Sequence, residues 1–195
     1  MTKSVILMGA RGNSIVKKQL FLCFLSLAAF GVVCSAQNWS VGAGVMYQAV
    51  DDFDDGGVTL AAHGSRIFGL PVGKLLLEAE LTQTVVWPER ELFNTSNVSV
   101  GFAEYSALTG GVYAAYSLSL PLGLLAKARV GATYVYSEIE SCIVGSCETQ
   151  DDSSVNISYG AALGYQITRR LSVLADWTQI EPDVFNVGAL VRVHL

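Results

Sequence analysis

The sequence predicts an all-β protein, namely an eight-stranded antiparallel transmembrane β-barrel with short periplasmic turns and longer extracellular loops. Its 195 residues are 51% hydrophobic and only 15% charged, whereas about a quarter of the residues in a typical soluble domain are charged. Eight segments alternate apolar and polar residues, which indicates strands with one apolar and one polar face. Short turns and longer polar links alternate between them, as expected for a barrel with an even number of strands.

The first element is a continuously apolar run at residues 20–34, which follows two lysines and precedes small residues. Such a run is too short for a comfortable membrane-spanning helix and is typical of a secretory signal. We therefore expect a signal peptide over residues 1–36, cleaved after Ala36, and a barrel domain over residues 37–195. An uncleaved N-terminal anchor and a lipoprotein acylated at Cys34 are the alternatives.

The eight predicted strands follow, and each carries apolar residues at nearly every second position. They cover residues 39–49, 58–65, 75–85, 108–118, 126–137, 155–166, 171–178 and 185–195. About ten alternating residues suffice to cross a bilayer as a tilted strand. Only a closed barrel lets such strands cross hydrocarbon with every backbone group paired.

The predicted connections sort by length and by charge. The short turns are 69–73, 121–123 and 168–170, and the long polar links are 51–57, 88–97, 139–152 and 179–183. Most acidic residues fall in the links, whereas the short-turn end holds Arg66, Lys74, Arg169 and Arg170. A soluble β-sandwich and a lipocalin-like soluble barrel are the alternatives. A soluble β-sandwich does not explain this sorting, and a lipocalin-like barrel would place its bulky apolar residues inside.

Aromatic side chains favour the same placement. They lie on the apolar faces, mostly near the strand ends, as the interfacial girdles of a membrane barrel require. These aromatic residues are Trp39, Tyr47, Tyr116, Tyr134, Tyr136, Tyr159, Tyr165, Trp177 and Phe185.

The final segment alternates most clearly, and only Leu190 interrupts its polar face. Its apolar face includes Phe185, Val187, Val191, Val193 and Leu195. A strand needs neighbours on both edges, and a closed barrel would supply the first and the seventh predicted strands.

The polar faces of the predicted strands carry charges of both signs. Three acidic and three basic residues point into the lumen on this parity: Glu78, Glu80, Asp176, Lys127, Arg129 and Arg192. Because an isolated buried charge costs several kcal/mol, we expect these residues to form an ion-pair network. The network is either a structural plug or a gate whose pairs rearrange to open a narrow pore. Several lumenal glycines leave room for the long side chains or for water.

The cysteines and the net charge limit which partners and which compartment we expect. Cys142 and Cys147 lie in a polar segment of a chain predicted to be exported, which predicts a disulfide that closes a small loop. A metal site would need further ligands, so we expect no metal and no cofactor. All 17 acidic residues follow position 36, whereas four of the 12 basic residues precede it. The strongly acidic domain argues against nucleic acid as a partner.

Catalysis has little support, and we expect neither catalytic residues nor an enzyme. His63 and Ser65 share a strand face, but that face points inward, whereas a hydrolase acting on lipid needs an outward pair and an orienting acid. The acidic run at 51–57 lacks the spacing of a calcium loop. We interpret it as a solvated surface, with loose bridging of divalent ions to lipopolysaccharide phosphates as the alternative.

Two stretches, residues 120–134 and residues 159–166 leading into the last hairpin, resemble the small eight-stranded outer-membrane β-barrels of Gram-negative bacteria. That family includes opacity-protein-like surface antigens and the barrel of outer membrane protein A. The resemblance implies the cell outer membrane as location, with outer-membrane lipid, lipopolysaccharide and the outer-membrane assembly machinery as partners. It also implies that the final strand is the assembly signal, although Leu195 departs from the aromatic residue that normally ends it.

These patterns together predict an integral outer-membrane barrel with a structural or surface-interaction role, such as adhesion or envelope integrity. An extracellular ligand would then meet the acidic loops, since binding specificity resides in loops. The alternative is a narrow, low-conductance pore for small solutes. A lipid-modifying outer-membrane enzyme is the less favoured third hypothesis.

Overall fold

The computed structural model describes residues 38–51, 53, 55–93, 95–96, 98–143 and 146–195. The chain divides into two units, Met1–Ala36 and Gln37–Leu195. The expected signal peptide at residues 1–36 lies outside the described residues. No helix among the described residues is long and apolar enough to span a membrane.

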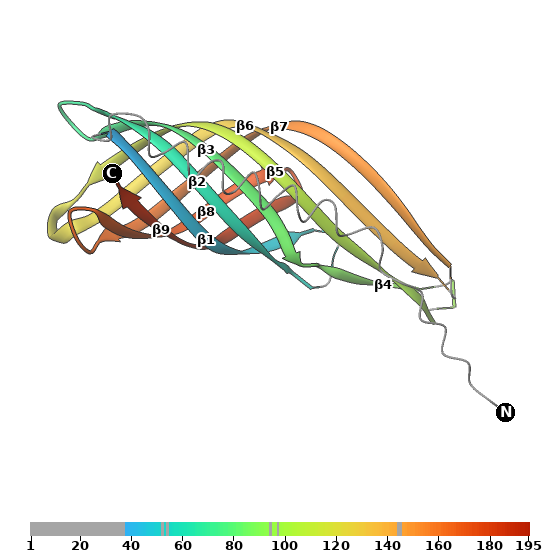
Figure 1. Cartoon of the computed structure of the whole chain (residues 1–195). Helices are drawn as coiled ribbons and strands as arrows, with labels where there is room; N and C mark the ends of the chain where they lie inside the picture. The colour runs from blue at the N-terminus through green and yellow to red at the C-terminus, as the bar shows by residue number, and fades with distance from the viewer. Residues whose placement is uncertain (1–37, 52, 54, 94, 97, 144–145) are drawn as a thin grey trace. The chain divides into compact units, whose positions relative to one another are not determined.

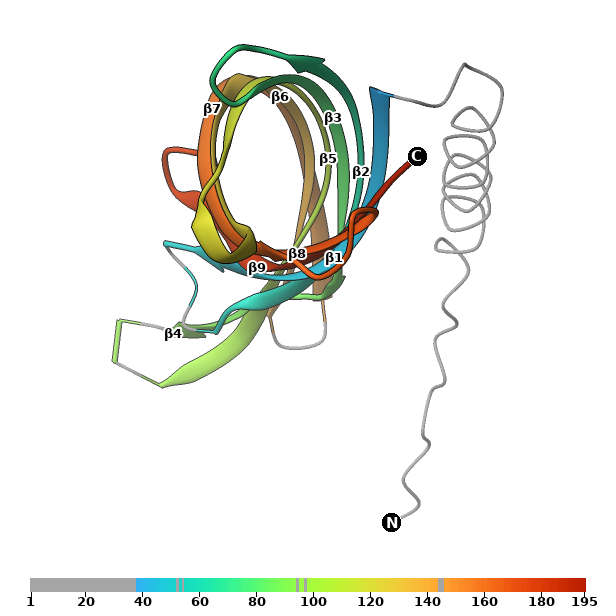
Figure 2. The same cartoon turned by 90° about the vertical axis from the view of Figure 1, so that its left-hand side faces the viewer.

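The second unit is a single antiparallel sheet that closes on itself (Figures 1 and 2). Its strands are β1 (Trp39–Val50), β2 (Gly57–Gly69), β3 (Lys74–Val86), β4 (Glu89–Phe93), β5 (Ser99–Ser119), β6 (Leu124–Ile143), β7 (Ser146–Gln166), β8 (Leu171–Glu181) and β9 (Val184–His194). The order is β3-β2-β1-β9-β8-β7-β6-β5-β4, and pairing of β3 with β5 completes the ring.

The short β4 continues β3 rather than adding a wall to the ring. The two strands are separated by Trp87 and Pro88. Both pair with β5: β3 pairs with residues 108–117 and β4 with residues 99–104. The Pro88 carbonyl accepts a hydrogen bond from the Tyr105 amide at 3.0 Å, which bridges the interruption. The ring therefore has eight strand positions, and the predicted eight-stranded antiparallel barrel is confirmed.

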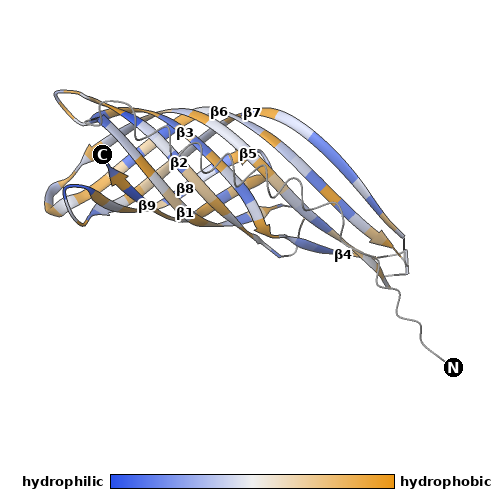
Figure 3. Cartoon of the chain, viewed as in Figure 1, coloured by the Kyte–Doolittle hydropathy of each residue, from blue (hydrophilic) through white to orange (hydrophobic). Residues whose placement is uncertain are grey.

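Alternation along the strands decides which side chains face outward. Val130, Ile157 and Leu163 are each at least 55% exposed on the outer surface, whereas their neighbours Arg129 and Ser158 are buried inside. Figure 3 shows the alternation of hydrophobic and hydrophilic residues along each ribbon. An apolar exterior around a polar interior is the reverse of a soluble barrel.

The short turns are where the sequence predicts them. Leu122 and Gly123 adopt positive φ angles of 64° and 79° within the 3₁₀ turn η2 (Pro121–Gly123). Gly73 does the same, at 76°, in the turn between β2 and β3. These left-handed residues let adjacent strands reverse within a few residues.

The predicted long links are largely wrong, because strands continue through them. Residues 88–97 contain β4, and residues 139–152 form the upper arms of the β6–β7 hairpin. The link at 179–183 is a tight turn in which the Asp183 carbonyl accepts a hydrogen bond from the Asp51 amide at 3.0 Å. Apart from Ile139, Ile143 and the two cysteines, the described residues of the upper arms are polar on both faces, so the period of two that marks a half-buried strand is largely missing from their sequence. They build, with β4 and the first half of β5, a tall four-stranded wall at one end of the barrel.

The interruption at Leu190 has a packing reason. Its side chain points into the barrel, is fully buried, and packs with Leu174 and Ala162. A Cβ atom added at Gly44 would lie 3.2 Å from a methyl group of Leu190. The glycine thus makes room for one large apolar side chain in a mostly polar interior.

Candidate functional site

The six predicted lumen charges come from four strands and meet inside the barrel. Glu78 and Glu80 lie on β3, Lys127 and Arg129 on β6, Asp176 on β8 and Arg192 on β9. Members of each pair are two residues apart, so both side chains point to the same face of their strand. All six are at most 4% exposed.

Glu78 is the first centre of this network. Its carboxylate accepts hydrogen bonds from the Lys127 Nζ at 3.2 Å and from the Arg192 Nη2 at 3.1 Å. The His63 Nε2 lies 3.3 Å from the same carboxylate. Two hydrogen-bonded cations and one imidazole therefore share a single acidic group, and the Arg129 Nη1 lies 3.8 Å from it.

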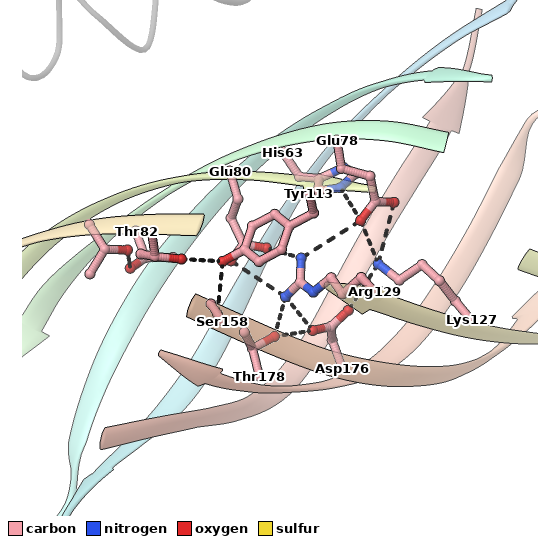
Figure 4. Close-up of polar contacts among 12 residues, drawn as sticks. His63, Glu78, Glu80, Thr82, Tyr113, Lys127, Arg129, Ser158, Asp176 and Thr178 are labelled. Carbon is pink, nitrogen blue, oxygen red and sulfur yellow. Dashed lines mark hydrogen bonds and ion pairs between the residues drawn. The ribbon is translucent and has the colours of Figure 1, made fainter. Parts of the chain in front are cut away.

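Arg129 is the second centre (Figure 4). Its two terminal nitrogens lie 2.7 Å from the Glu80 and Asp176 carboxylates, and it also donates to the Thr178 hydroxyl. Lys127 joins the two centres, since its Nζ lies 3.2 Å from Asp176 as well as from Glu78. The six charged residues thus form one connected cluster, here called the lumen network.

The balance of charge explains why these side chains tolerate burial. Three carboxylates face three permanent cations, and each of the six has at least one partner of opposite sign. A buried charge with no partner costs several kcal/mol, and removing one partner of a buried pair typically costs about 3–5 kcal/mol. The lumen network therefore holds β3, β6, β8 and β9 in register.

Tyr113 is a lumen residue that the sequence analysis missed. Its ring lies 4.6 Å from the Arg129 guanidinium carbon, and its hydroxyl is 2.8 Å from the Thr133 hydroxyl. A Cβ atom added at Gly111 would lie 2.6 Å from the Tyr113 ring, so the glycine makes room for it. The signal was present, because Thr109, Gly111 and Tyr113 share one face of β5.

Hydroxyl and apolar layers fill the barrel beyond the charges. The Thr82 and Thr109 hydroxyls are 2.7 Å apart, and Thr84 donates to the Gln48 side chain at 2.9 Å. A hydrophobic cluster follows toward the wall and consists of Tyr105, Ala107, Val135 and Ile180. An eight-stranded barrel has an interior that side chains just fill, and these layers occupy it.

His63 and Ser65 are not arranged as a catalytic pair. The Ser65 hydroxyl is 2.6 Å from the Ser40 hydroxyl, whereas His63 contacts Glu78. Both side chains are buried within the barrel. A nucleophile needs its base within hydrogen-bond distance and access to substrate, and neither condition is met here.

The predicted disulfide is confirmed, since Cys142 and Cys147 are joined across the tip of the β6–β7 hairpin. In the part of the chain that the structure describes, one group of side chains has metal-ligand spacing, and it consists of these cysteines with Glu140. Two of its three ligands are consumed by the disulfide.

The final strand lies between β8 and β1, as a closed barrel requires. The Leu195 amide donates to the Trp39 carbonyl at 2.9 Å and extends the pairing with β1. The outward side chains are Phe185, Val187, Val191, Val193 and Leu195.

Neither a protein-family model nor a curated protein sequence matches the chain. Among solved structures, Ail, the attachment invasion locus protein of Yersinia pestis, in complex with the heparin analogue sucrose octasulfate, is similar with a TM-score of 0.50 and 16% identity over 80% of this chain and 97% of that chain. The chain has the fold of the small eight-stranded outer-membrane β-barrels.

Two further barrels are similar at lower scores. Neisserial surface protein A gives a TM-score of 0.48 and 12% identity over 83% of this chain and 99% of that chain. The N-terminal β-barrel domain of Pseudomonas aeruginosa OprF gives 0.47 and 15% identity over 82% and 98%.

Proposed function

We propose that the protein is an integral barrel of the cell outer membrane, exported through a cleaved signal peptide at residues 1–36, with a structural or surface-interaction role. The exterior supports this location, because it is an apolar band with aromatic residues such as Tyr134 and Tyr159 exposed on it. Tyr159 also packs edge-on against Trp177, with ring centroids 5.8 Å apart. Its partners in that setting are outer-membrane lipid and lipopolysaccharide, and the final strand is the signal read by the assembly machinery.

The observation that carries the role is the contrast between a filled lumen and a tall acidic wall. Glu104 on β5 lies directly opposite Glu89 on one side and Glu140 on the other. Glu138 similarly faces Asp151 across the β6–β7 pair. Like charges directly opposite one another destabilise a sheet, so the fold gains nothing from this row. A positively charged partner bound at this surface would offset the repulsion within this row of acidic residues.

The solved complex of Ail contains a heparin analogue, which is a polyanion. The acidic wall of the present chain would repel such a ligand, so we propose a positively charged partner for this wall.

Display of the full chain on Gram-negative cells tests this role. Cells carrying the protein should adhere to a polylysine-coated surface more than cells carrying the triple variant Glu104→Gln, Glu138→Gln, Glu140→Gln. The control is Glu148→Gln. A triple control variant that also removed the charges of Asp51 and Glu80 would be unsuitable, because Glu80 belongs to the lumen network. Equal adhesion of wild type and triple variant, at equal surface amounts, would contradict the proposal.

A narrow pore is the second candidate function, and the sharing of ion-pair partners within the lumen network favours it. Glu78 and Asp176 each contact more than one cation, so Lys127 can exchange between them without losing a partner. A gate needs two arrangements of similar free energy. If the pore exists, Glu78→Gln should change ion selectivity in reconstituted bilayers, whereas the outward change Glu138→Gln should not.

A further inference from the structure

A separate cavity of about 280 Å³ lies at the mouth of the barrel, beside the wall and away from the lumen network. We call it the vestibule. Its lining residues are Val50, Phe53, Tyr105, Ser137, Ile139, Gln150, Asp152, Glu181, Asp183 and Val184.

One side of the vestibule is built by the wall. Tyr105 on β5 lies opposite Ile139 on β6, which lies opposite Gln150 on β7. Ser137 and Asp152 form the next inward pair of the same strands. Regular pairing therefore fixes the positions of five lining residues relative to one another.

The other side is the rim of the barrel at which β1 and β8 end and β9 begins. Val50 and Val184 pair across β1 and β9, and Glu181 ends β8. Val50, Phe53 and Ile139 also pack against the hydrophobic cluster that closes the lumen. The vestibule thus has a fixed apolar floor, as preformed small-molecule sites do.

Charge in the vestibule has one sign. Asp152, Glu181 and Asp183 contribute carboxylates, and the described residues that line the cavity include no Lys, Arg or His. Glu181 is held in place by hydrogen bonds from the Ser154 hydroxyl at 2.5 Å and the Asn156 amide at 2.7 Å. An acceptor-only group fixed in this way favours a ligand that donates hydrogen bonds.

The Tyr105 hydroxyl is the second sign of a ligand. The side chain is 5% exposed and lines the cavity. Ser137 lies close to the hydroxyl, but the contact lacks hydrogen-bond geometry, and the hydroxyl has no other partner among the described residues. A buried hydroxyl without a partner is unfavourable, and a bound donor would supply that partner.

Two aromatic rings also line the vestibule. The Phe53 and Tyr105 ring centroids are 5.9 Å apart. The guanidinium carbon of Arg90, which is not a lining residue, lies 5.3 Å from the Phe53 centroid. This part of the molecule therefore already packs a cation against an aromatic face, an arrangement that is attractive by itself.

We propose that the vestibule binds an alkylammonium group, that is, a protonated primary amine on an apolar stem, as in a small free amine or a lysine side chain. The ammonium group donates to the vestibule carboxylates and to the Tyr105 hydroxyl oxygen, and the stem packs on Val50, Ile139 and Val184. The volume fits a side chain rather than a drug-sized ligand. The inference deepens the proposed surface role and rests on it, because the mouth must open to the medium.

Calorimetry on the purified barrel in lipid nanodiscs tests the assignment with three isosteric probes: n-butylamine, butan-1-ol and butyrate. Butylamine should bind at least tenfold more tightly than butan-1-ol, and butyrate should not bind. The double variant Asp152→Asn, Glu181→Gln should weaken butylamine binding at least tenfold, and Tyr105→Phe severalfold. Glu91→Gln removes an exposed carboxylate of β4 that does not line the vestibule and should leave binding unchanged.

Folding of each variant is checked by its heat-modifiable mobility in electrophoresis, so that loss of binding is not confused with loss of structure. A blocked Gly-Lys-Gly peptide distinguishes the two sources, since it binds only if the vestibule accepts a lysine side chain from a protein. Equal binding of the amine and the alcohol, or full binding by the folded double variant, would overturn the assignment. Equal adhesion of wild type and the triple variant Glu104→Gln, Glu138→Gln, Glu140→Gln, with butylamine binding intact, would instead contradict the proposed attachment role alone.

Discussion

Single residues in the lumen network differ in how many partners depend on them. Lys127, Arg129 and Arg192 all lie within 4 Å of the Glu78 carboxylate, at 3.2, 3.8 and 3.1 Å. Glu80 has one cationic partner among the described residues, namely Arg129. The two glutamates are both buried and lie two positions apart on β3, so they form a natural pair of matched sites.

We expect Glu78→Gln to destabilise the barrel by about 3–5 kcal/mol, because it leaves Arg192 without its ion-pair partner in the lumen. Glu80→Gln should cost less, because Arg129 keeps Asp176 at 2.7 Å. Urea unfolding of the protein in lipid vesicles, followed by tryptophan fluorescence, measures both. A cost for Glu80→Gln equal to or above that for Glu78→Gln would contradict this ranking.

Residue parity allowed the members of the lumen network to be predicted from the sequence, whereas the contacts between them could not be predicted. Each charged residue could be assigned to an inner face by counting in twos along its strand. Which acid meets which base depends on strand stagger, and the sequence pattern does not contain the stagger. Tyr113 shares the inner parity of Thr109 and Gly111, but its ring fits the lumen only because Gly111 makes room for it, and an alternating apolar and polar pattern does not contain that fit.

The wall is the element whose behaviour differs most from that of the barrel below it. The segment that carries Glu138 and Asp151 is polar and looks like a loop in sequence. Backbone pairing of β6 with β7 nevertheless continues to Ile143 and Ser146. Strand boundaries could be predicted where one face meets lipid and could not be predicted where both faces meet water.

Acidic repulsion in the wall gives it a defined pH dependence. Burial, followed by the charges of Glu89 and Glu140, raises the pKa of Glu104. The folded wall therefore binds this proton more tightly than the unfolded chain does, and its stability increases as the pH falls through the raised pKa. At neutral pH the repulsion is fully present.

Glu104→Gln should consequently increase hydrogen-exchange protection of β4–β6 in the wall at pH 7, by several tenths of a kcal/mol up to about 1 kcal/mol. The gain should vanish at a pH below the ordinary glutamate pKa of 4.5. Glu148→Gln is the control, because Glu148 lies opposite Ser141 and not opposite another acid. Lower protection of the Glu104 variant at pH 7 would refute the mechanism.

The disulfide should act on the hairpin tip alone. Replacing Cys142 and Cys147 by serine removes a cross-link that closes a very short loop, so the cost is expected near about 2 kcal/mol, at the low end of the usual range. Amide exchange should accelerate in the upper arms of β6 and β7 and stay unchanged in β1, β8 and β9. A fall in the unfolding midpoint of the whole barrel as large as that of Glu78→Gln would show that the wall and barrel unfold together.

At the scale of the whole molecule, the account describes a closed cylinder filled in layers. The Ser40–Ser65 contact lies nearest the short turns, followed by the lumen network, the threonine layer and the apolar cluster. The vestibule lies beyond that cluster. We therefore expect ligands to reach the mouth and the charged and apolar layers together to block ions.

Current across a planar bilayer tests this central claim most directly. The refolded barrel is inserted, and insertion is verified by protection of the strands from protease. We predict no ohmic steps above the bare bilayer at moderate voltage, for the wild type and for Glu138→Gln alike. Stable, ion-selective openings of the wild type whose selectivity changes in Glu78→Gln would contradict the closed lumen and establish the pore instead.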